Sequence, residues 1–208
     1  MAKKLDFLYL DTGAMYRAVA LEAQRKGIDI GEKKELRKLC QNLDLRFQTD
    51  GEGTKLYLGA EDISLAIRTP EMDLLSYTIS AIKEVREAMT GLQRKIGQKG
   101  RLVAEGRDMG TVVFPDAEYK FFITASTEVR AERRYKERIN RSESVSLEEV
   151  EKELKIRDHQ DETRPIAPLR PAKDAKIIDT TSLNPNDVIE RILQEMGYIH
   201  TSKKSRNL

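Results

Sequence analysis

Two short stretches place polar side chains directly after apolar runs typical of buried strands. DFLYL is followed by Asp11, Thr12 and Gly13, and RLVAEG is followed by Arg107 and Asp108. Ligands of open parallel sheets bind beyond the carboxyl ends of the strands, so both stretches are candidate binding loops. The Thr12 hydroxyl and the amides of a helix start suit an anion. Arg107 can fork onto a phosphate, and Asp108 can accept a hydrogen bond from an exocyclic amine. Each stretch alone also fits a helix cap or a surface turn.

A third pattern lies in IRDHQDETR, where Arg157, Asp161 and Arg164 follow the i, i+4, i+7 spacing of one helix face. The preceding predicted helix carries five arginines, namely Arg130, Arg133, Arg134, Arg138 and Arg141. The outer members, Arg138 and Arg141, fit a solvated, salt-bridged face equally well. Three prolines in RPIAPLRPA then end the helical region. A basic helical hairpin with such an exit favours a lid that closes over polyphosphate, excludes water and brings arginine to a transferring phosphoryl group.

The elements that must position these residues alternate along the chain, which predicts an α/β fold with a mostly parallel sheet. We expect strands at 6–10, 101–106, 119–125 and 175–181. We expect helices at 12–27, 31–43, 71–98 with a weak break at Gly91, 127–141, 146–165 and 184–197. A small antiparallel hairpin is expected at 45–58, turning around residues 50–53.

Composition narrows the function classes. The 208 residues suit one domain, and the net charge of +2 argues against a nucleic-acid partner. Cys40 is the single cysteine and is expected to be a buried core residue, which fits a reducing cytoplasm. His159 and His200 are far apart, so no metal site is predicted from protein ligands. The chain has no apolar run of membrane-spanning length and no signal peptide before the first strand, and a soluble monomer is expected.

Taken together, these residues resemble the bacterial cytidylate kinases. The stretches that carry the resemblance include LDTGAMYR (10–17), IRTPE (67–71), EGRDMGTVVFPDA (105–117) and IDTT (178–181). The resemblance covers residues 6 to about 195. It implies a three-layer, P-loop-kinase-like parallel sheet flanked by helices. It also implies a single domain at 1–200, with a nucleoside-monophosphate-binding region at 12–98 that includes a small β insert at 45–66, a lid at 127–170 and a basic tail at 201–208.

The resemblance further implies phosphoryl transfer from ATP to CMP or dCMP, with Mg²⁺, in cytoplasmic pyrimidine metabolism. It assigns the CMP phosphate to Arg17, Arg107 and Arg164, and the cytosine edge to Arg86 and Asp108. It assigns the ribose hydroxyls to Arg157 and Asp161, and a capping and nucleotide contact to Thr12. Arg130 and Arg134 are lid candidates for the ATP phosphates, and with Arg157 and Arg164 they form the expected catalytic set. In the family, a serine often contacts the base. At the spacing expected for that serine this chain has Tyr77, with Ser76 beside it. Which of the two residues contacts the base is left undecided.

One element of the family pattern is not found in this sequence. The phosphate-binding loop G-x-x-x-x-G-K-[ST] requires a Gly-Lys pair, and none of the twelve glycines is followed by Lys. Ala2-Lys3-Lys4-Leu5 resembles the last turn of the helix that follows this loop. We therefore expect a sequence that starts late, without the central first strand, and with little or no phosphoryl transfer. The alternative hypothesis is an impaired form that only binds CMP.

Overall fold

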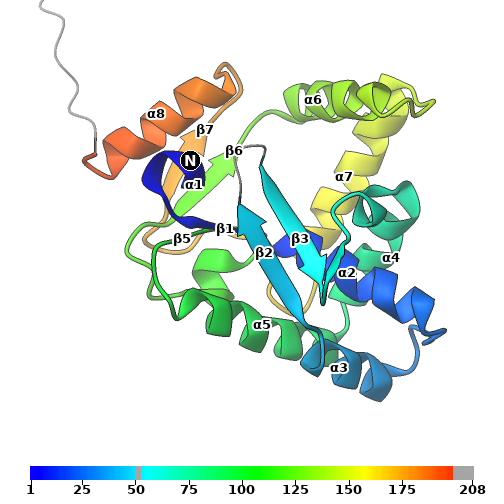
Figure 1. The fold of residues 1–208 in the computed structure, drawn as a ribbon. Helices are drawn as coiled ribbons and strands as arrows, with labels where there is room; N and C mark the ends of the chain where they lie inside the picture. Colours follow the sequence, from blue (N-terminus) through cyan, green and yellow to red (C-terminus); the bar gives the residue numbers. More distant parts are fainter. Residues whose placement is uncertain (50–52, 199–208) are drawn as a thin grey trace, which may run out of the picture. The chain divides into compact units, whose positions relative to one another are not determined.

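The computed structural model of the chain describes residues 1–49 and 53–198 (Figure 1). The chain divides into two compact units. Unit 1 comprises Met1–Phe114 together with Arg164–Ala167, and unit 2 comprises Pro115–Thr163 together with the chain from Pro168 onward. The prediction of a single domain with a lid stays a prediction.

Unit 1 contains a parallel pair of strands, β1 (Leu8–Asp11) and β5 (Leu102–Glu105). Their register places Leu8 opposite Leu102 and Asp11 opposite Glu105, so the two strands end side by side. The two strand predictions are confirmed, and the polar residues after each strand lie at the same end of the pair. This shared end is where the candidate site is built.

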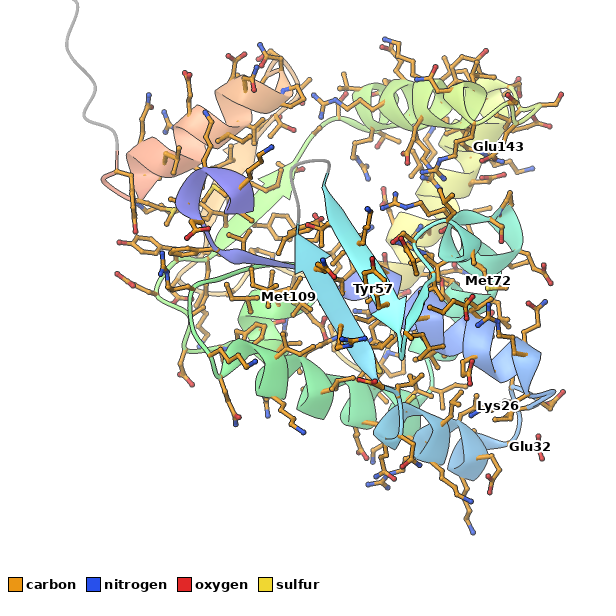
Figure 2. The ribbon with its side chains drawn as sticks, in the orientation of Figure 1. Lys26, Glu32, Tyr57, Met72, Met109 and Glu143 are labelled. Atoms are coloured by element: carbon orange, nitrogen blue, oxygen red, sulfur yellow. The ribbon has the colours of Figure 1, made fainter. Side chains whose placement is uncertain are left out.

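The helices of unit 1 surround a buried apolar core. They are α1 (Ala2–Leu5), α2 (Thr12–Arg25), α3 (Lys33–Gln41), α4 (Pro70–Ser80) and α5 (Lys83–Gly97), with a 3₁₀ turn at Ala66–Arg68. α2 packs against α4, and α3 packs against α5. Met72 on α4 is buried, whereas the charged Lys26 and Glu32 between α2 and α3 are exposed at the surface (Figure 2). The apolar face of each helix therefore supplies the core.

The expected single helix at 71–98 with a break at Gly91 is wrong. α4 ends at Ser80 and α5 begins at Lys83, while Gly91 lies inside α5. Ile82 adopts an extended conformation, with φ −76° and ψ 123°, and its side chain is buried in the core. Burial of Ile82 thus fixes the break, while a glycine on an open helix surface costs only about 1 kcal/mol.

The predicted hairpin is confirmed as a small antiparallel sheet. β2 (Leu45–Thr49) pairs with β3 (Thr54–Leu58), which pairs in turn with β4 (Glu61–Asp62). The expected turn at 50–53 falls largely on residues 50–52, outside the described residues. Glu61 accepts two hydrogen bonds from Arg25, at 2.7 and 2.8 Å, which joins this sheet to the end of α2.

Unit 2 contains the second parallel pair, β6 (Phe121–Thr124) and β7 (Lys176–Asp179). Its helices are α6 (Thr127–Asn140), α7 (Leu147–Thr163) and α8 (Pro185–Glu195), and α6 and α7 pack against each other as a helical hairpin (Figure 1). Ser146 and Glu149 form a capping box at the start of α7 through reciprocal hydrogen bonds. The predicted α/β class with parallel strands, flanking helices and a small antiparallel sheet is confirmed.

Hydrogen bonds fasten the start of α6 to the ends of β6 and β7. Arg133 donates to the Thr180 carbonyl at 2.6 Å, to the Thr180 hydroxyl at 3.1 Å and to the Leu183 carbonyl at 3.1 Å. The Thr180 hydroxyl donates in turn to the Thr124 carbonyl at 2.9 Å. Arg130 donates to the carbonyl of Ala125 at 3.1 Å. The base of the hairpin is therefore joined to both strands.

Among the described helices, none combines the length and the apolar character needed to cross a membrane. The residues that the structure describes, 1–49 and 53–198, contain no group of three or more His, Cys, Asp and Glu side chains that could hold a metal ion.

We expect Cys40 to resist alkylation in the folded protein. Its side chain is 2% exposed on α3, and burial raises the pKa of the thiol to about 12. Because the thiolate is the nucleophile, both burial and the raised pKa slow the reaction. Iodoacetamide at pH 8 should modify the native chain at least about 100-fold more slowly than the chain in denaturant. Equal rates in the two states would contradict the buried position.

Candidate active site

Thr12 joins the ends of β1 and β5. It is the first residue of α2, is buried, and donates its hydroxyl hydrogen to the Glu105 carbonyl at 2.7 Å. The expectation that Thr12 caps the helix is wrong, because the cap is the preceding residue, Asp11. The Asp11 carboxylate accepts from the Ala14 amide at 2.8 Å. The carboxylate satisfies an amide that would otherwise lack a partner, and Thr12 is left to fix the strand ends.

Gly106 allows Thr12 to lie close to the end of β5. A Cβ at Gly106 would lie 2.4 Å from the Thr12 hydroxyl oxygen and 2.9 Å from the terminal methyl carbon of Met109. Real Cβ atoms essentially never approach so closely, so any side chain here would push Thr12 or Met109 aside. The glycine is therefore required by packing at the point where β5 leads into Arg107 and Asp108.

Arg86 and Asp108 form a buried ion pair, with the residues 5% and 6% exposed. Arg86 comes from α5 and Asp108 from the loop after β5, so the structure brings together two residues to which the family resemblance assigns one role. Arg86 also donates to the Ser80 carbonyl at the end of α4, at 3.0 Å. A charge buried in this way is stable only when paired and hydrogen-bonded, and Arg86 has both kinds of partner.

Tyr16 completes this pair and was missed by the sequence reasoning. The Arg86 guanidinium carbon lies 5.8 Å from the centre of the Tyr16 ring, within the range of a cation–π contact. Burial raises the pKa of the Tyr16 phenol to about 12, an effect that the charges of Arg86 and Arg164 oppose. The only sequence signal was the position of Tyr16, one helical turn after Thr12.

A π-helical turn at Met109–Val113 follows Asp108 directly. The carbonyl of Asp108 accepts from the amides of Val112 and Val113, at 2.9 and 3.2 Å. Arg94 of α5 donates to the carbonyls of Val112 and Val113, at 2.7 and 3.0 Å. The turn was not predicted, since its i to i+5 bonds leave no periodic signal in five residues. It ties the loop that carries Asp108 to the helix that carries Arg86.

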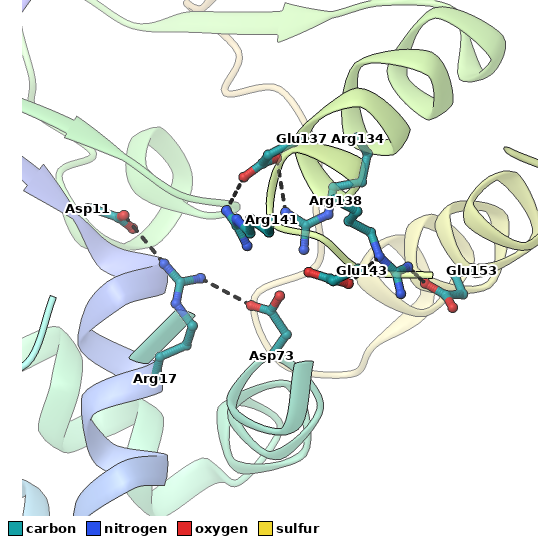
Figure 3. A network of polar contacts seen from close by, with 9 residues as sticks. All are labelled: Asp11, Arg17, Asp73, Arg134, Glu137, Arg138, Arg141, Glu143 and Glu153. Atoms are coloured by element: carbon teal, nitrogen blue, oxygen red, sulfur yellow. Dashed lines mark hydrogen bonds and ion pairs between the residues drawn. The ribbon is translucent and has the colours of Figure 1, made fainter. Parts of the chain in front are cut away.

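Arg17 points back from α2 toward the helix start (Figure 3). Its guanidinium lies between two carboxylates, 3.5 Å from that of Asp11 and 3.7 Å from that of Asp73 on α4. Arg17 Nε is buried without a hydrogen-bond partner among the described residues. The arginine predicted to hold a phosphate is therefore held in place by two anionic groups of the protein.

Arg164 does not lie on the helix face predicted for it. α7 ends at Thr163, and Arg164 follows the helix and groups with unit 1. The physical reason is Pro165, because a residue that precedes proline is pushed out of the helical region. Arg164 Nε donates to the Ala167 carbonyl at 2.7 Å, and its charge acts on the Tyr16 hydroxyl. The exposed Arg107 lies in the loop after β5, beside Asp108.

The remaining predicted residues lie in unit 2. Arg157 is exposed and Asp161 is buried, one turn apart on α7 as expected. Arg130 on α6 forms an ion pair with Asp158 on α7 at 2.7 Å, and Arg134 pairs with Glu137 at 3.0 Å.

Arg138 near the end of α6 and Arg141, which caps that helix, match the salt-bridged alternative. Arg138 binds Glu143 and Glu153, at 2.8 and 2.7 Å, and Arg141 binds Glu137 (Figure 3).

The structure does not decide whether Ser76 or Tyr77 takes the place of the base-contacting serine. The Ser76 hydroxyl donates to the Asp73 carbonyl at 3.0 Å within α4 and is nearly buried, while Tyr77 is half-buried. The positions of these two side chains do not decide which of them contacts the base.

Comparisons with known proteins point in one direction. A family model described as cytidylate kinase matches residues 1–198. A protein of Citrifermentans bemidjiense named cytidylate kinase is 52% identical over 190 residues, covering 91% of this chain and 82% of the relative. Proteins with the same name from Syntrophotalea carbinolica and Carboxydothermus hydrogenoformans are 47% identical over 194 residues and 45% over 197. These two alignments cover 93% and 95% of this chain, and 83% and 89% of the relatives.

Proposed function

This chain belongs to the cytidylate kinase family, which transfers the terminal phosphoryl group of ATP to CMP or dCMP, and from that premise we propose how its side chains hold the acceptor nucleotide. The observation that supports the proposal best is the buried Arg86–Asp108 pair at the joined ends of β1 and β5. The names of the relatives favour an active kinase over an impaired form that only binds CMP, so they do not favour the expectation of little or no phosphoryl transfer.

Asp108 and Arg86 are proposed to read the cytosine edge. Cytosine presents an exocyclic amine that donates, beside a ring nitrogen and a carbonyl oxygen that accept. One Asp108 oxygen accepts from Arg86, so the carboxylate can accept the cytosine amine with its other oxygen. Uracil has a carbonyl oxygen in place of the amine, and this oxygen would face a carboxylate. The pair therefore favours CMP over UMP.

Arg17, Arg107 and Arg164 are proposed to hold the CMP phosphate. All three belong to unit 1, together with Asp108. Guanidinium groups bind phosphate oxygens through paired, charge-assisted hydrogen bonds, which fixes both position and orientation. In phosphoryl transfer, catalysis consists mainly of positioning and charge neutralisation, so a clamp that fixes the attacking oxygen contributes directly to the rate. Thr12, between the two strand ends, is proposed to contact the same nucleotide.

Arg157 and Asp161 are proposed to contact the ribose hydroxyls, and Arg130 and Arg134 the phosphates of ATP. Like Arg164, Arg157 is proposed to act near the reacting phosphates. Mg²⁺ is proposed to accompany ATP, and when bound it would neutralise negative charge that develops during the transfer. We further propose a monomeric chain in the cytoplasm.

Replacing Arg17 by Ala tests the phosphate clamp. We expect the dissociation constant for CMP to rise about 30-fold, because one charge-assisted contact to the phosphate is lost. Isothermal titration calorimetry would give the value, with cytidine as the control ligand because it has no phosphate. Cytidine binding should change less than about twofold. Equal losses for CMP and cytidine would remove Arg17 from the phosphate contact.

A further inference from the structure

Arg17 lies between two carboxylates that come from different elements of unit 1 (Figure 3). Asp11 caps α2 through the Ala14 amide, at 2.8 Å, so moving this carboxylate would undo the helix start. Gly13 leaves room for the arrangement, because a Cβ there would lie 3.3 Å from the Arg17 guanidinium. The Asp11 carboxylate is therefore a fixed part of the local fold.

Asp73 approaches Arg17 from a different element. It lies in the first turn of α4, whose cap is Thr69, and α4 packs directly against α2. The Asp73 carboxylate reaches the other terminal nitrogen of Arg17, at 3.7 Å, and the two side chains are 26% and 18% exposed. At this distance and exposure the pair is an electrostatic contact that a stronger anion can replace.

From this geometry we infer that Asp73 competes with the CMP phosphate for Arg17 and thereby lowers the affinity of the site for CMP. A phosphate that binds Arg17 through Nη1 needs the nitrogen atom that the Asp73 carboxylate approaches. Asp11 is fixed by capping, so Asp73 is the anion that the phosphate must displace. The CMP phosphate carries nearly two negative charges at neutral pH, and a carboxylate left a few ångströms away weakens its binding. The inference rests on the proposed role of Arg17 in the phosphate clamp.

The effect has a sign that separates it from a positioning role. If Asp73 competes with phosphate, its removal tightens CMP binding. If Asp73 only orients Arg17, its removal weakens CMP binding. The competition also requires a phosphate on the ligand and a guanidinium at residue 17, so cytidine and an Arg17 variant provide two internal tests.

The experiment is isothermal titration calorimetry of CMP into the 208-residue chain. Asp73→Asn is expected to lower the dissociation constant about three- to tenfold and to leave that of cytidine, measured by displacement of CMP, unchanged. Asp73→Ala, which also removes the carboxylate, should give the same gain. In the Arg17→Ala background the gain should fall below about twofold.

The matched control is Glu71→Gln. Glu71 lies on the same turn of α4 and carries the same charge, but it accepts a hydrogen bond from Gln24 and not from Arg17. It is expected to leave CMP affinity within about twofold of the wild type. A gain of the same size in Glu71→Gln, or one that persists without Arg17, would mean a general charge effect and overturn the inference.

Two further outcomes separate this inference from the proposed function. Wild-type binding of CMP with equal or weaker binding by both Asp73 variants would overturn the inference and leave the phosphate clamp standing. Failure of the folded wild type to bind CMP would overturn both. Thermal melts of every variant would show which chains are folded.

Discussion

Replacing Asp108 by Asn is expected to lower kcat/KM for CMP about 1,000-fold. The substitution keeps the shape of the side chain but removes the charge that pairs with the buried Arg86. It also removes an acceptor proposed for the cytosine amine, and binding sites built around hydrogen bonds reject a wrong partner by about 10⁴-fold or more. An Asn amide can instead donate to the uracil oxygen, so kcat/KM for UMP should fall much less. A coupled assay of ADP release with CMP and UMP would measure both.

The same variant should be less stable. Removing one partner of a buried ion pair leaves the other charge uncompensated, which costs about 3–5 kcal/mol. Denaturant unfolding of the variant would give the difference in the free energy of unfolding.

Asp6→Asn is the matched control for Asp108→Asn. The Asp6 side chain is 98% exposed and pairs with Arg101 only at 3.7 Å, so neither activity nor stability should change measurably. Asp6 has a positive φ of 53°, a conformation that Asn adopts well. If Asp108→Asn kept the CMP to UMP preference of the wild type, Asp108 would not be the residue that reads the base.

Gly106→Ala should disrupt the site without touching a charged residue. The new methyl carbon would lie 2.4 Å from the Thr12 hydroxyl oxygen, so the bond from Thr12 to the Glu105 carbonyl must break or the loop must move. We expect a loss of about 2–3 kcal/mol in the free energy of unfolding, as for other overpacked sites. Displacement of Arg107 and Asp108 by about 1 Å should lower kcat/KM for CMP about 100-fold.

Gly91→Ala provides the comparison for this second change. A Cβ at Gly91 would meet nothing within 4 Å, and the residue lies inside α5. Ala at this position should raise the free energy of unfolding by about 0.5–1 kcal/mol and leave activity unchanged. Thermal or denaturant unfolding of both variants, with the same kinase assay, would test the contrast. A Gly106→Ala chain as stable and active as the wild type would show that Thr12 can move without consequence.

Much of the fold could be predicted from the spacing of apolar residues and from the residues that begin or end helices and strands. The apolar runs at 6–10 and 101–106 predicted β1 and β5, and the helix expected from residue 71 begins at Pro70 in α4. The family resemblance assigned Arg86 and Asp108 to one role, and the structure places the two side chains in contact. These features are local or are carried by specific motifs, so a single sequence contains the information.

The rest depends on contacts between residues that are distant in sequence. The break at Ile82 comes from burial in the core, and no helix-breaking residue marks it. Asp73 has the spacing of an ordinary charged residue in a first helical turn, and only the packing of α4 on α2 brings it to Arg17. The exit of Arg164 from α7 could have been predicted, because Pro165 follows it directly. Tyr16 belongs to the site because its ring lies next to Arg86, a contact between two helices that no local pattern indicates.

The anchoring of α6 by Arg133 has a mechanical consequence. Three hydrogen bonds from this guanidinium bind the root of the α6–α7 hairpin to Thr180 and Leu183, beyond the end of β7. When a helical hairpin is anchored at one end, a rotation about that end displaces each residue in proportion to its distance from the anchor. Residues 141–146 lie farthest from this anchor, so any rotation of the hairpin about its root would displace them most.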